Sequence, residues 1–284
     1  SDGVVGSSLK TITVTGGTSG QEFDLGDFRG SAAGSINSVD LSGMAGNITL
    51  EVDDANDDAT ITLGSGTNTL VVTAGSSSTA GVTITGNTGA DTVTGTTVAD
   101  TADLGAGADK FTGGGNSDTV TTGSGADTVV FSAATTDTDS NGVADATTTI
   151  TDFTAGTGGD ILHVSDNIFA GYLVTHDSAA VALVSVAIAD ALAGTNSGLG
   201  EDETSSNYVI YDTAAAIIAG VTTSGVIYVA SGADVLMAIA NDTGAIYAAS
   251  DPSGTGGNCS LLTQVGTINS GMGSLTAANL LVIA

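Results

Sequence analysis

The sequence predicts an all-β protein whose central part coils as a right-handed parallel β-roll or β-helix solenoid. Three observations carry this prediction. Aspartate recurs every nine residues in the middle of the chain, short segments that alternate apolar and polar residues continue on both sides, and the composition favours turns over long helices. The 284 residues include 42 glycines and one proline, and only 4% are aromatic. The core is therefore expected to consist of thin layers of Val, Ile, Leu and Ala.

The charge of the chain excludes two kinds of partner. It has 31 acidic and 3 basic residues, and its net charge at pH 7 is −28. Three cations cannot neutralise a nucleic-acid backbone, and an anionic membrane surface repels so acidic a chain. The longest apolar stretch is also too short to span a bilayer. We therefore expect no nucleic-acid partner and no membrane insertion.

Residues 1–85 are expected to form an N-terminal β-rich region. Apolar residues alternate there in short groups that are separated by Gly, Ser, Thr, Asn and Asp, which is the pattern of half-buried strands and turns. Either further solenoid coils or a β-sandwich would produce it, and the sequence favours coils. The groups are Ile12/Val14, Phe23/Leu25, Val39/Leu41, Ile48/Leu50/Val52, Ile61/Leu63, Leu70/Val72 and Val82/Ile84.

A nine-residue repeat defines the next region, residues 86–132. Each repeat is expected to be a glycine-rich turn followed by a very short strand, such as Thr92–Thr94 or Thr128–Val130. A residue that tolerates a positive φ, such as Gly89 or Asn116, precedes most of the aspartates by two positions. The aspartates are Asp91, Asp100, Asp109, Asp118 and Asp127, and the apolar residues two positions after them are Val93, Ala102, Phe111, Val120 and Val129.

Two repeats make one coil of eighteen residues, so alternate aspartates fall on the same edge. Asp91, Asp109 and Asp127 lie on one edge, and Asp100 and Asp118 lie on the other. Carboxylates stacked at the strand spacing of about 4.8 Å repel one another. A row of Ca²⁺ ions, held by the aspartates and by turn carbonyls, would remove this repulsion. The alternative is a metal-free solenoid in which the aspartates only cap turns.

The repeat resembles the G-G-x-G-x-D-x-U-x nonapeptide of the repeats-in-toxin (RTX) family, a calcium-binding β-roll sequence. The stretches GNTGADTVT, LGAGADKFT, GGGNSDTVT and TGSGADTVV match it, whereas GTTVADTAD has Val98 where glycine is expected. The resemblance implies that the edge with Asp91, Asp109 and Asp127 is the better calcium edge. The ligands that it implies are the five aspartates together with Gly89, Gly105, Gly107, Gly123 and Gly125.

Residues 133–284 change in character and are expected to form a C-terminal capping and secretion-signal region. The stretch DTDSNGVAD places Asp137, Asp139, Asn141 and Asp145 around a glycine, as in the first nine positions of an EF-hand-like calcium loop. Thr148 stands where an EF-hand needs its glutamate, so a complete EF-hand is not expected. The stretch would suit either a calcium site or a solvated loop.

The rest of this region is expected to be mostly β with one short helix. ITDFTAGTGGDILHVS resembles the segment that follows RTX repeats and closes the roll, with Asp152 and Asp160 as turn caps or ligands, caps being favoured. Apolar residues at helical spacing predict an amphipathic helix within Asp177–Ala193. NYVIYDTA, GVIYVA and GAIYAASD are expected to be strands, and the apolar tail SLTAANLLVIA resembles an uncleaved type I secretion signal.

No catalytic motif accompanies the repeats, so an enzyme is not expected. His163 and His176 are the only histidines and do not form H-E-x-x-H, no serine lies in G-x-S-x-G, and Cys259 has no cationic neighbour in sequence. VDLSGMAGNITLEV and ITLGSGTNTLVV resemble segments of RTX-type bacterial surface-layer (S-layer) proteins.

The resemblance implies a secreted, extracellular or cell-surface protein that leaves the cell through a type I secretion apparatus and folds outside on binding Ca²⁺. The favoured role is a structural subunit that assembles with copies of itself into an S-layer or filament. The alternative is the C-terminal folding and secretion module of a larger enzyme, toxin or adhesin.

Overall fold

The structure is a computed structural model of the chain and is mostly β, with parallel strand pairing and one short helix among the residues that it describes. Those residues are 4–6, 11–19, 22–30, 36–74, 79–131, 143–165, 181–184, 207–222, 228–229, 235–250, 257–258, 261–272, 275–276 and 279–283. The chain divides into two compact units. Unit 1 comprises Ser1–Val130 with Ile150–Asp152, and unit 2 comprises Phe131–Thr149 with Phe153–Ala284.

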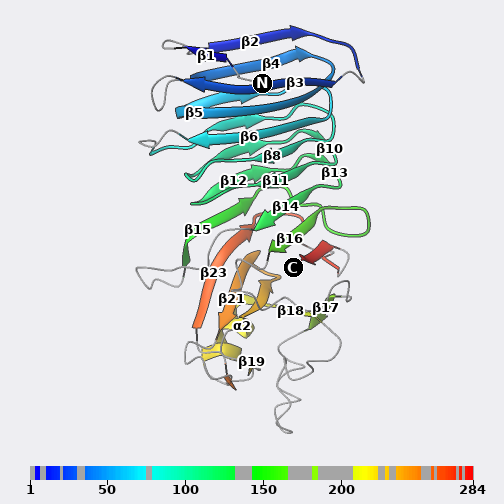
Figure 1. Cartoon of the computed structure of the whole chain (residues 1–284). Helices are drawn as coiled ribbons and strands as arrows, with labels where there is room; N and C mark the ends of the chain where they lie inside the picture. The colour runs from blue at the N-terminus through cyan, green and yellow to red at the C-terminus, as the bar shows by residue number, and fades with distance from the viewer. Residues whose placement is uncertain are drawn as a thin grey trace. The chain divides into compact units, whose positions relative to one another are not determined.

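Unit 1 is built from parallel strands that lie one above another (Figure 1). Its strands are β1 (Val4–Gly6), β2 (Thr11–Gly16), β3 (Glu22–Gly30), β4 (Ile36–Met44), β5 (Asn47–Thr62), β6 (Asn68–Ala74), β7 (Thr83–Thr85), β8 (Thr92–Thr94), β9 (Thr101–Asp103), β10 (Ala106–Gly107), β11 (Lys110–Thr112), β12 (Asp118–Thr121), β13 (Ser124–Gly125) and β14 (Thr128–Phe131).

These strands form two parallel ladders. Ladder A runs β1–β3–β5–β6–β8–β11–β14, and ladder B runs β2–β4–β5–β7–β9–β12. The sixteen-residue strand β5 belongs to both, its first part to ladder A and its last part to ladder B. Thr92 pairs with Lys110 and Lys110 with Thr128, so each step is eighteen residues, as the repeat predicts. Strands β10 and β13 pair with each other in parallel. In the sequence, β10 lies between β9 and β11, and β13 lies between β12 and β14.

The core of unit 1 consists of the predicted alternating apolar residues. Each short repeat strand turns one apolar side chain inward, and in β11 this is Phe111, which is 0% exposed. The large inward residues lie in successive coils and therefore stack on one another along both ladders. The predicted residues that the structure buries are Val39, Leu41, Ile48, Leu50, Val52, Ile61, Leu63, Leu70, Val72, Val82, Ile84, Val93, Ala102, Phe111, Val120 and Val129.

Phe111→Ala is expected to destabilise the protein by about 3–5 kcal/mol, because it removes the largest buried ring of the repeat coils and leaves a cavity that rigid strands cannot close. Urea denaturation measures the change. The matched control is Val71→Ala on the outer face of β6, where the side chain is 37% exposed and where truncation is expected to change the free energy of unfolding by about 0.5 kcal/mol or less. Equal effects at the two positions would contradict the observed core.

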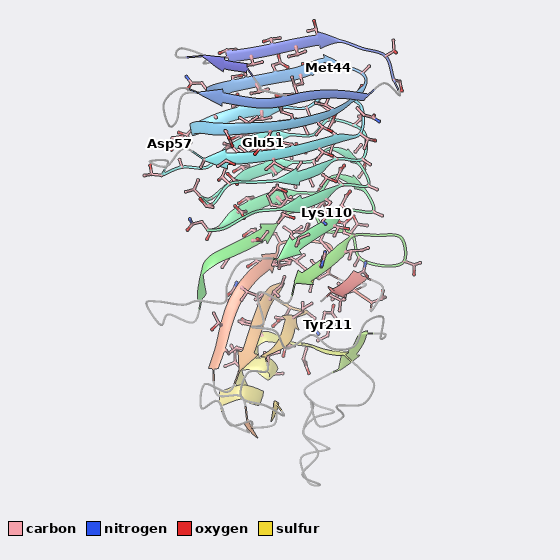
Figure 2. The ribbon with its side chains drawn as sticks, in the orientation of Figure 1. Met44, Glu51, Asp57, Lys110 and Tyr211 are labelled. Carbon is pink, nitrogen blue, oxygen red and sulfur yellow. The ribbon has the colours of Figure 1, made fainter. Side chains whose placement is uncertain are left out.

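Threonine occupies the outward positions of the short strands. In ladder B, Thr60, Thr83, Thr101 and Thr119 follow one another in register, and all are exposed or half-buried. A β-branched side chain suits a strand, and stacked threonines stabilise one another across strands. In ladder A the same kind of row contains Lys110 between Thr92 and Thr128, and Lys110 is exposed (Figure 2). The outer faces of unit 1 are thus uncharged over most of these positions and chemically repetitive.

Unit 2 is a mixed β structure with one helix. Its strands are β15 (Val143–Ile150), β16 (Ile161–Ser165), β17 (Val181–Val184), β18 (Asn207–Asp212), β19 (Tyr228–Val229), β20 (Val235–Ala240), β21 (Ala245–Ser250), β22 (Gly257–Asn258), β23 (Leu261–Ile268) and β24 (Leu280–Ile283), and its helix is α2 (Ala214–Thr222). The strands β17, β18 and β20 pair in parallel, whereas β21 pairs antiparallel with both β20 and β23. Strands thus occur in all three C-terminal segments that the sequence predicts to form them, namely β18, β19 and β21.

The helix predicted within Asp177–Ala193 is wrong for Val181–Val184, which form strand β17 and pair in register with Asn207–Ile210 of β18. The other residues of that prediction lie outside the described part of the chain. Aliphatic residues such as Val181 suit both structures, and here pairing with a neighbouring strand overrides helical spacing. The observed helix is α2, where the hydroxyl of Thr213 accepts the N–H of Ala216 as an N-cap.

Two further contacts hold unit 2 together. The Asp242 carboxylate accepts the N–H of Ala214 at the start of α2, at 2.8 Å, and the Tyr211 hydroxyl donates to the carbonyl of Met272, at 2.9 Å (Tyr211 is marked in Figure 2). Neither contact was foreseen from the sequence. Across the described residues, the structure contains no helix with the length and apolarity that a membrane crossing requires.

Candidate functional site

The five repeat aspartates are all buried in the turns of unit 1, and each is 3% exposed or less. They form two rows, as their spacing predicts. The first row is Asp91, Asp109 and Asp127, and the second row is Asp100 and Asp118. Each aspartate of the first row stands immediately before a short strand of ladder A, β8, β11 or β14, so that parallel pairing at eighteen-residue steps stacks the side chains.

Hydrogen bonds connect the members of the first row. The N–H of Asp91 donates to Oδ1 of Asp109 at 2.7 Å, and the N–H of Asp109 donates to Oδ1 of Asp127 at 2.8 Å. The carboxylates of Asp109 and Asp127 therefore each accept the backbone N–H of the aspartate one coil earlier, which places one oxygen of each within the row. Hydrogen bonds to a charged oxygen are stronger than neutral ones and offset part of the repulsion between stacked acids.

The second carboxylate oxygen is the unusual feature of this row. Oδ2 of Asp91 and Oδ2 of Asp109 are buried and have no hydrogen-bond partner in the described structure. Buried carboxylate oxygens are normally hydrogen-bonded, because removal from water without a partner costs about 1–3 kcal/mol for a neutral group and more for a charged one. Two orphaned oxygens in neighbouring turns therefore mark a place where the protein supplies acceptors without donors.

Asp100 in the second row has a different environment. Its Oδ1 accepts the N–H of Val82 at 2.8 Å and the hydroxyl of Thr96 at 2.8 Å, and its Oδ2 accepts the N–H of Thr96 at 2.6 Å. Both oxygens are therefore satisfied by the protein. Asp100 belongs to the repeat that has Val98 in place of glycine. The repeat with the different sequence is thus also one in which both carboxylate oxygens accept hydrogen bonds. The row continues because the N–H of Asp100 donates to Oδ1 of Asp118 at 3.0 Å.

The five predicted glycines lie in the segments just before the aspartates of the first row, with Gly107 in β10 and Gly125 in β13. A Cβ atom added at Gly105 would collide with the carbonyl oxygen of Asn87, and one at Gly107 with that of Gly89. The same holds one coil later for Gly123 and Gly125. The backbone of successive turns thus approaches too closely for any side chain, and the turn carbonyls are brought beside the aspartates. Gly89 and Asn116 also have the positive φ that was expected of them, 107° and 56°.

Burial raises the pKa of the row carboxyls. The pKa of Asp91 rises to about 7, chiefly through desolvation and in part through the negative charge of Asp109, although hydrogen bonds from Asn68 oppose the rise. Desolvation likewise raises the pKa of Asp118 to about 8, with the charge of Asp100 adding to it. It also raises the pKa of Asp100 and of Asp109. The turns of Asp91 and Asp118 therefore favour either a proton or another cation at neutral pH.

Four further predicted ligands belong to the stretch DTDSNGVAD. Asp137, Asp139 and Asn141 lie outside the described residues, and position 145 lies in β15 with its side chain likewise outside them. In the described part of the chain, no three His, Cys, Asp or Glu side chains gather where they could hold one metal ion. A site in the first row would therefore have to combine two aspartates with backbone carbonyls, as oxygen-rich calcium sites often do.

Asp152 and Asp160 both accept backbone N–H groups, as a turn cap would. Oδ1 of Asp152 accepts the N–H of Thr122 at 2.7 Å, and its Oδ2 accepts the N–H of Gly123 at 2.9 Å. Asp160 accepts the N–H of Thr154 at 2.7 Å within unit 2. His163 is a residue of strand β16, as expected, whereas His176 and Cys259 lie outside the described residues.

Sequence reasoning missed Asn68, which belongs to the first row. Its backbone N–H donates to Oδ1 of Asp91 at 2.9 Å, which is the contact that each aspartate of the row makes with the next. A signal was present, because LGSGTNTLV (residues 63–71) matches the nonapeptide with asparagine in place of aspartate. It lies twenty-three residues before Asp91 instead of eighteen, and a search for aspartate at fixed spacing passes over it.

Comparison of the chain with models of known protein families, with curated proteins and with solved structures found no match.

Proposed function

We propose that the first row binds calcium and that the chain is a secreted structural protein that folds as an RTX-like β-roll when Ca²⁺ is bound. The single observation that carries the calcium part is the pair of buried, orphaned oxygens, Oδ2 of Asp91 and Oδ2 of Asp109. Acceptors without donors, buried beside turns that bring backbone carbonyls close, call for a cation. Oxygen-only ligands suit Ca²⁺, whose coordination geometry is flexible, better than the smaller Mg²⁺, which demands octahedral geometry.

The residues that would hold the ions are Asp91, Asp109 and Asp127 with the carbonyl groups of the glycine turns. A bound divalent cation supplies positive charge between carboxylates that otherwise repel one another. The hydrogen bond from each aspartate N–H to the next carboxylate orients one oxygen of that carboxylate, and burial excludes water that would compete for the other. The second row is the weaker candidate, because Thr96 already satisfies both oxygens of Asp100.

This chemistry provides a switch between the inside and the outside of the cell. At the sub-micromolar Ca²⁺ of a cytosol the sites are empty, and self-repulsion of a chain with a net charge of −28 opposes compaction. Extracellular calcium modules bind at about 10⁻⁴ to 10⁻³ M, and a site filled at about 100 times its dissociation constant adds about 2.7 kcal/mol. Because stacked coils share ions, folding along the row is cooperative.

The biological role that we propose is a subunit of an S-layer or extracellular filament, made by copies of this chain outside the cell. The resemblance of residues 39–52 and 61–72 to surface-layer segments supports it, as does the repetitive threonine surface of unit 1. Such a surface offers the same chemistry at every coil, which suits lateral contact between identical subunits. The secretion apparatus is the other partner that this proposal requires.

The test of the calcium switch is circular dichroism of the purified chain at increasing Ca²⁺. We expect a reduced β signal in chelator, a cooperative rise to the full β spectrum at millimolar Ca²⁺, and reversal when chelator is added back. Equimolar Mg²⁺ serves as the control and is expected to leave the spectrum near that of the metal-free chain. The same β content with and without Ca²⁺ would show that ions do not drive folding.

Electron microscopy of the calcium-loaded chain tests the structural role separately. Sheets or filaments are expected, and they should disappear when chelator is added. Monomers that have bound calcium and folded, but do not assemble at any concentration, would replace the subunit role by that of a folding module of a larger secreted protein.

A further inference from the structure

Asn68 occupies the position of a row aspartate but makes contacts that no aspartate could make. Its side-chain Nδ2 lies 2.8 Å from Oδ1 of Asp91, 2.8 Å from the carbonyl oxygen of Gly66 and 3.1 Å from that of Gly64, and its two hydrogens are shared among these three acceptors. Asn68 and Asp91 are both buried, with exposures of 1%. Its nitrogen is thus surrounded by a carboxylate oxygen of the next coil and by two carbonyl oxygens of its own turn, whereas its Oδ1 is buried and has no hydrogen-bond partner among the described residues.

These three acceptors are of the kind that a calcium ion would use in the proposed row. Gly64 and Gly66 stand at the second and fourth positions of LGSGTNTLV, where Gly105 and Gly107 stand in LGAGADKFT. The next coil lies directly against this turn, since a Cβ atom on Gly89 would collide with the carbonyl oxygen of Gly66. The partially positive –NH₂ group therefore sits between a glycine turn and the aspartate of the following coil.

We propose that the amide of Asn68 replaces a calcium ion at the first turn of the row, so that the metal-dependent part of the protein begins only after this turn. The inference rests on the proposed function, since it assigns the boundary of that same site. Asn68 supplies donors from the chain itself, and the turn of residues 63–71 keeps its contact with Asp91 whether or not Ca²⁺ is present. The coils on its N-terminal side therefore do not depend on Ca²⁺. The turn of residues 63–71 is folded without the ion, and the calcium-binding coils add to it.

Substitution of Asn68 by aspartate is the sharpest test, because the two side chains have the same shape. Asn68→Asp would set a carboxylate oxygen beside Oδ1 of Asp91 and the carbonyls of Gly64 and Gly66, with no donor among them. We expect the variant to bind one more Ca²⁺ per chain than the wild type in isothermal titration calorimetry. In chelator it should unfold at lower temperature than the wild type, and saturating Ca²⁺ should restore most of the difference.

Two further variants make the outcome decisive. Asn241→Asp adds the same charge at an exposed turn of unit 2 and is expected to leave both the stoichiometry and the chelator midpoint unchanged. Asn68→Ala removes the donors without adding a ligand, and it is expected to lower the midpoint in chelator and in Ca²⁺ alike without changing the stoichiometry. These controls separate a converted site from a general effect of charge or of a lost contact.

The results distinguish this inference from the proposal beneath it. A wild-type chain that binds no Ca²⁺ overturns the proposed function. A wild type that binds Ca²⁺, together with an Asn68→Asp variant of unchanged stoichiometry, overturns the role of the amide and leaves the calcium row intact. Failure of Asn68→Asp to fold even in saturating Ca²⁺ also overturns it, because a converted site must be rescued by the ion.

Discussion

Replacing Asp109 by asparagine is expected to stabilise the metal-free chain at pH 8 and to destabilise the calcium-loaded chain. Without metal, the substitution removes a buried carboxyl group whose Oδ2 has no hydrogen-bond partner among the described residues, while the amide keeps an Oδ1 that can accept the N–H of Asp91. The new –NH₂ group can donate within its own turn, as that of Asn68 does. With metal, the change deletes a ligand that Asp109 would share between both neighbouring turns, and about 2.7 kcal/mol is lost for each ion no longer bound at 100 times its dissociation constant.

The measurement is thermal or urea unfolding of wild type and Asp109→Asn, each in chelator and in 10 mM Ca²⁺. The matched control is Asp103→Asn, which removes the same charge from an exposed side chain of β9 and should shift both conditions little and in the same direction. Stabilisation of Asp109→Asn in Ca²⁺ as well as in chelator would favour the metal-free alternative, in which the aspartates only cap turns. A calcium row therefore requires that Asp109→Asn raise the free energy of unfolding in chelator and lower it in Ca²⁺.

The metal-free chain is expected to be more stable at pH 5 than at pH 8, which is the reverse of the usual behaviour of paired carboxylates. The folded-state pKa of Asp91, about 7, and of Asp118, about 8, lie above the ordinary 3.8 that applies to the unfolded chain. Between these values the folded state binds more protons than the unfolded state, so stability falls as pH rises. Each pKa unit corresponds to about 1.4 kcal/mol, and the two carboxyls together reach several kcal/mol.

Unfolding midpoints at pH 5, 6, 7 and 8 test this, first in metal-free buffer and then in Ca²⁺. In Ca²⁺ the trend is expected to reverse, because protons compete with the ion for the same carboxylates. Asp118→Asn should flatten the metal-free profile, while Asp103→Asn should leave its slope unchanged and so account for general charge repulsion. A metal-free stability that is constant or rises from pH 5 to pH 8 would contradict the burial of these groups.

The periodicity of the sequence predicted which apolar residues face inward and which aspartates stack. Alternation placed Ile48, Leu70 and Val120 inward, because neighbouring side chains of a strand point to opposite faces. The eighteen-residue coil placed Asp91 over Asp109, because parallel strands of equal length stack in register. These features follow from backbone geometry, which is the same in every repeat.

Contacts between distant residues could not be predicted in the same way. The strand at Val181–Val184 depends on pairing with Asn207–Ile210, and aliphatic spacing in one segment carries no information about that partner. Thr96 satisfies Asp100 through a turn that departs from the repeat, and Asn68 joins the first row after a longer coil. In each case a side chain found its partner through the path of the chain in space.

The sequence by itself determined that this is an acidic, all-β chain with aspartates in two stacked rows, since composition and period dictate both. Only the tertiary structure decided that these carboxylates are buried and that Asp91 and Asp109 each keep one oxygen without a donor among the described residues. It also placed Asn68 beside Asp91 in the first row. The physical reason is that the nine-residue spacing of the aspartates brings alternate side chains to the same edge. Their burial and hydrogen bonding depend instead on how closely one coil packs against the next.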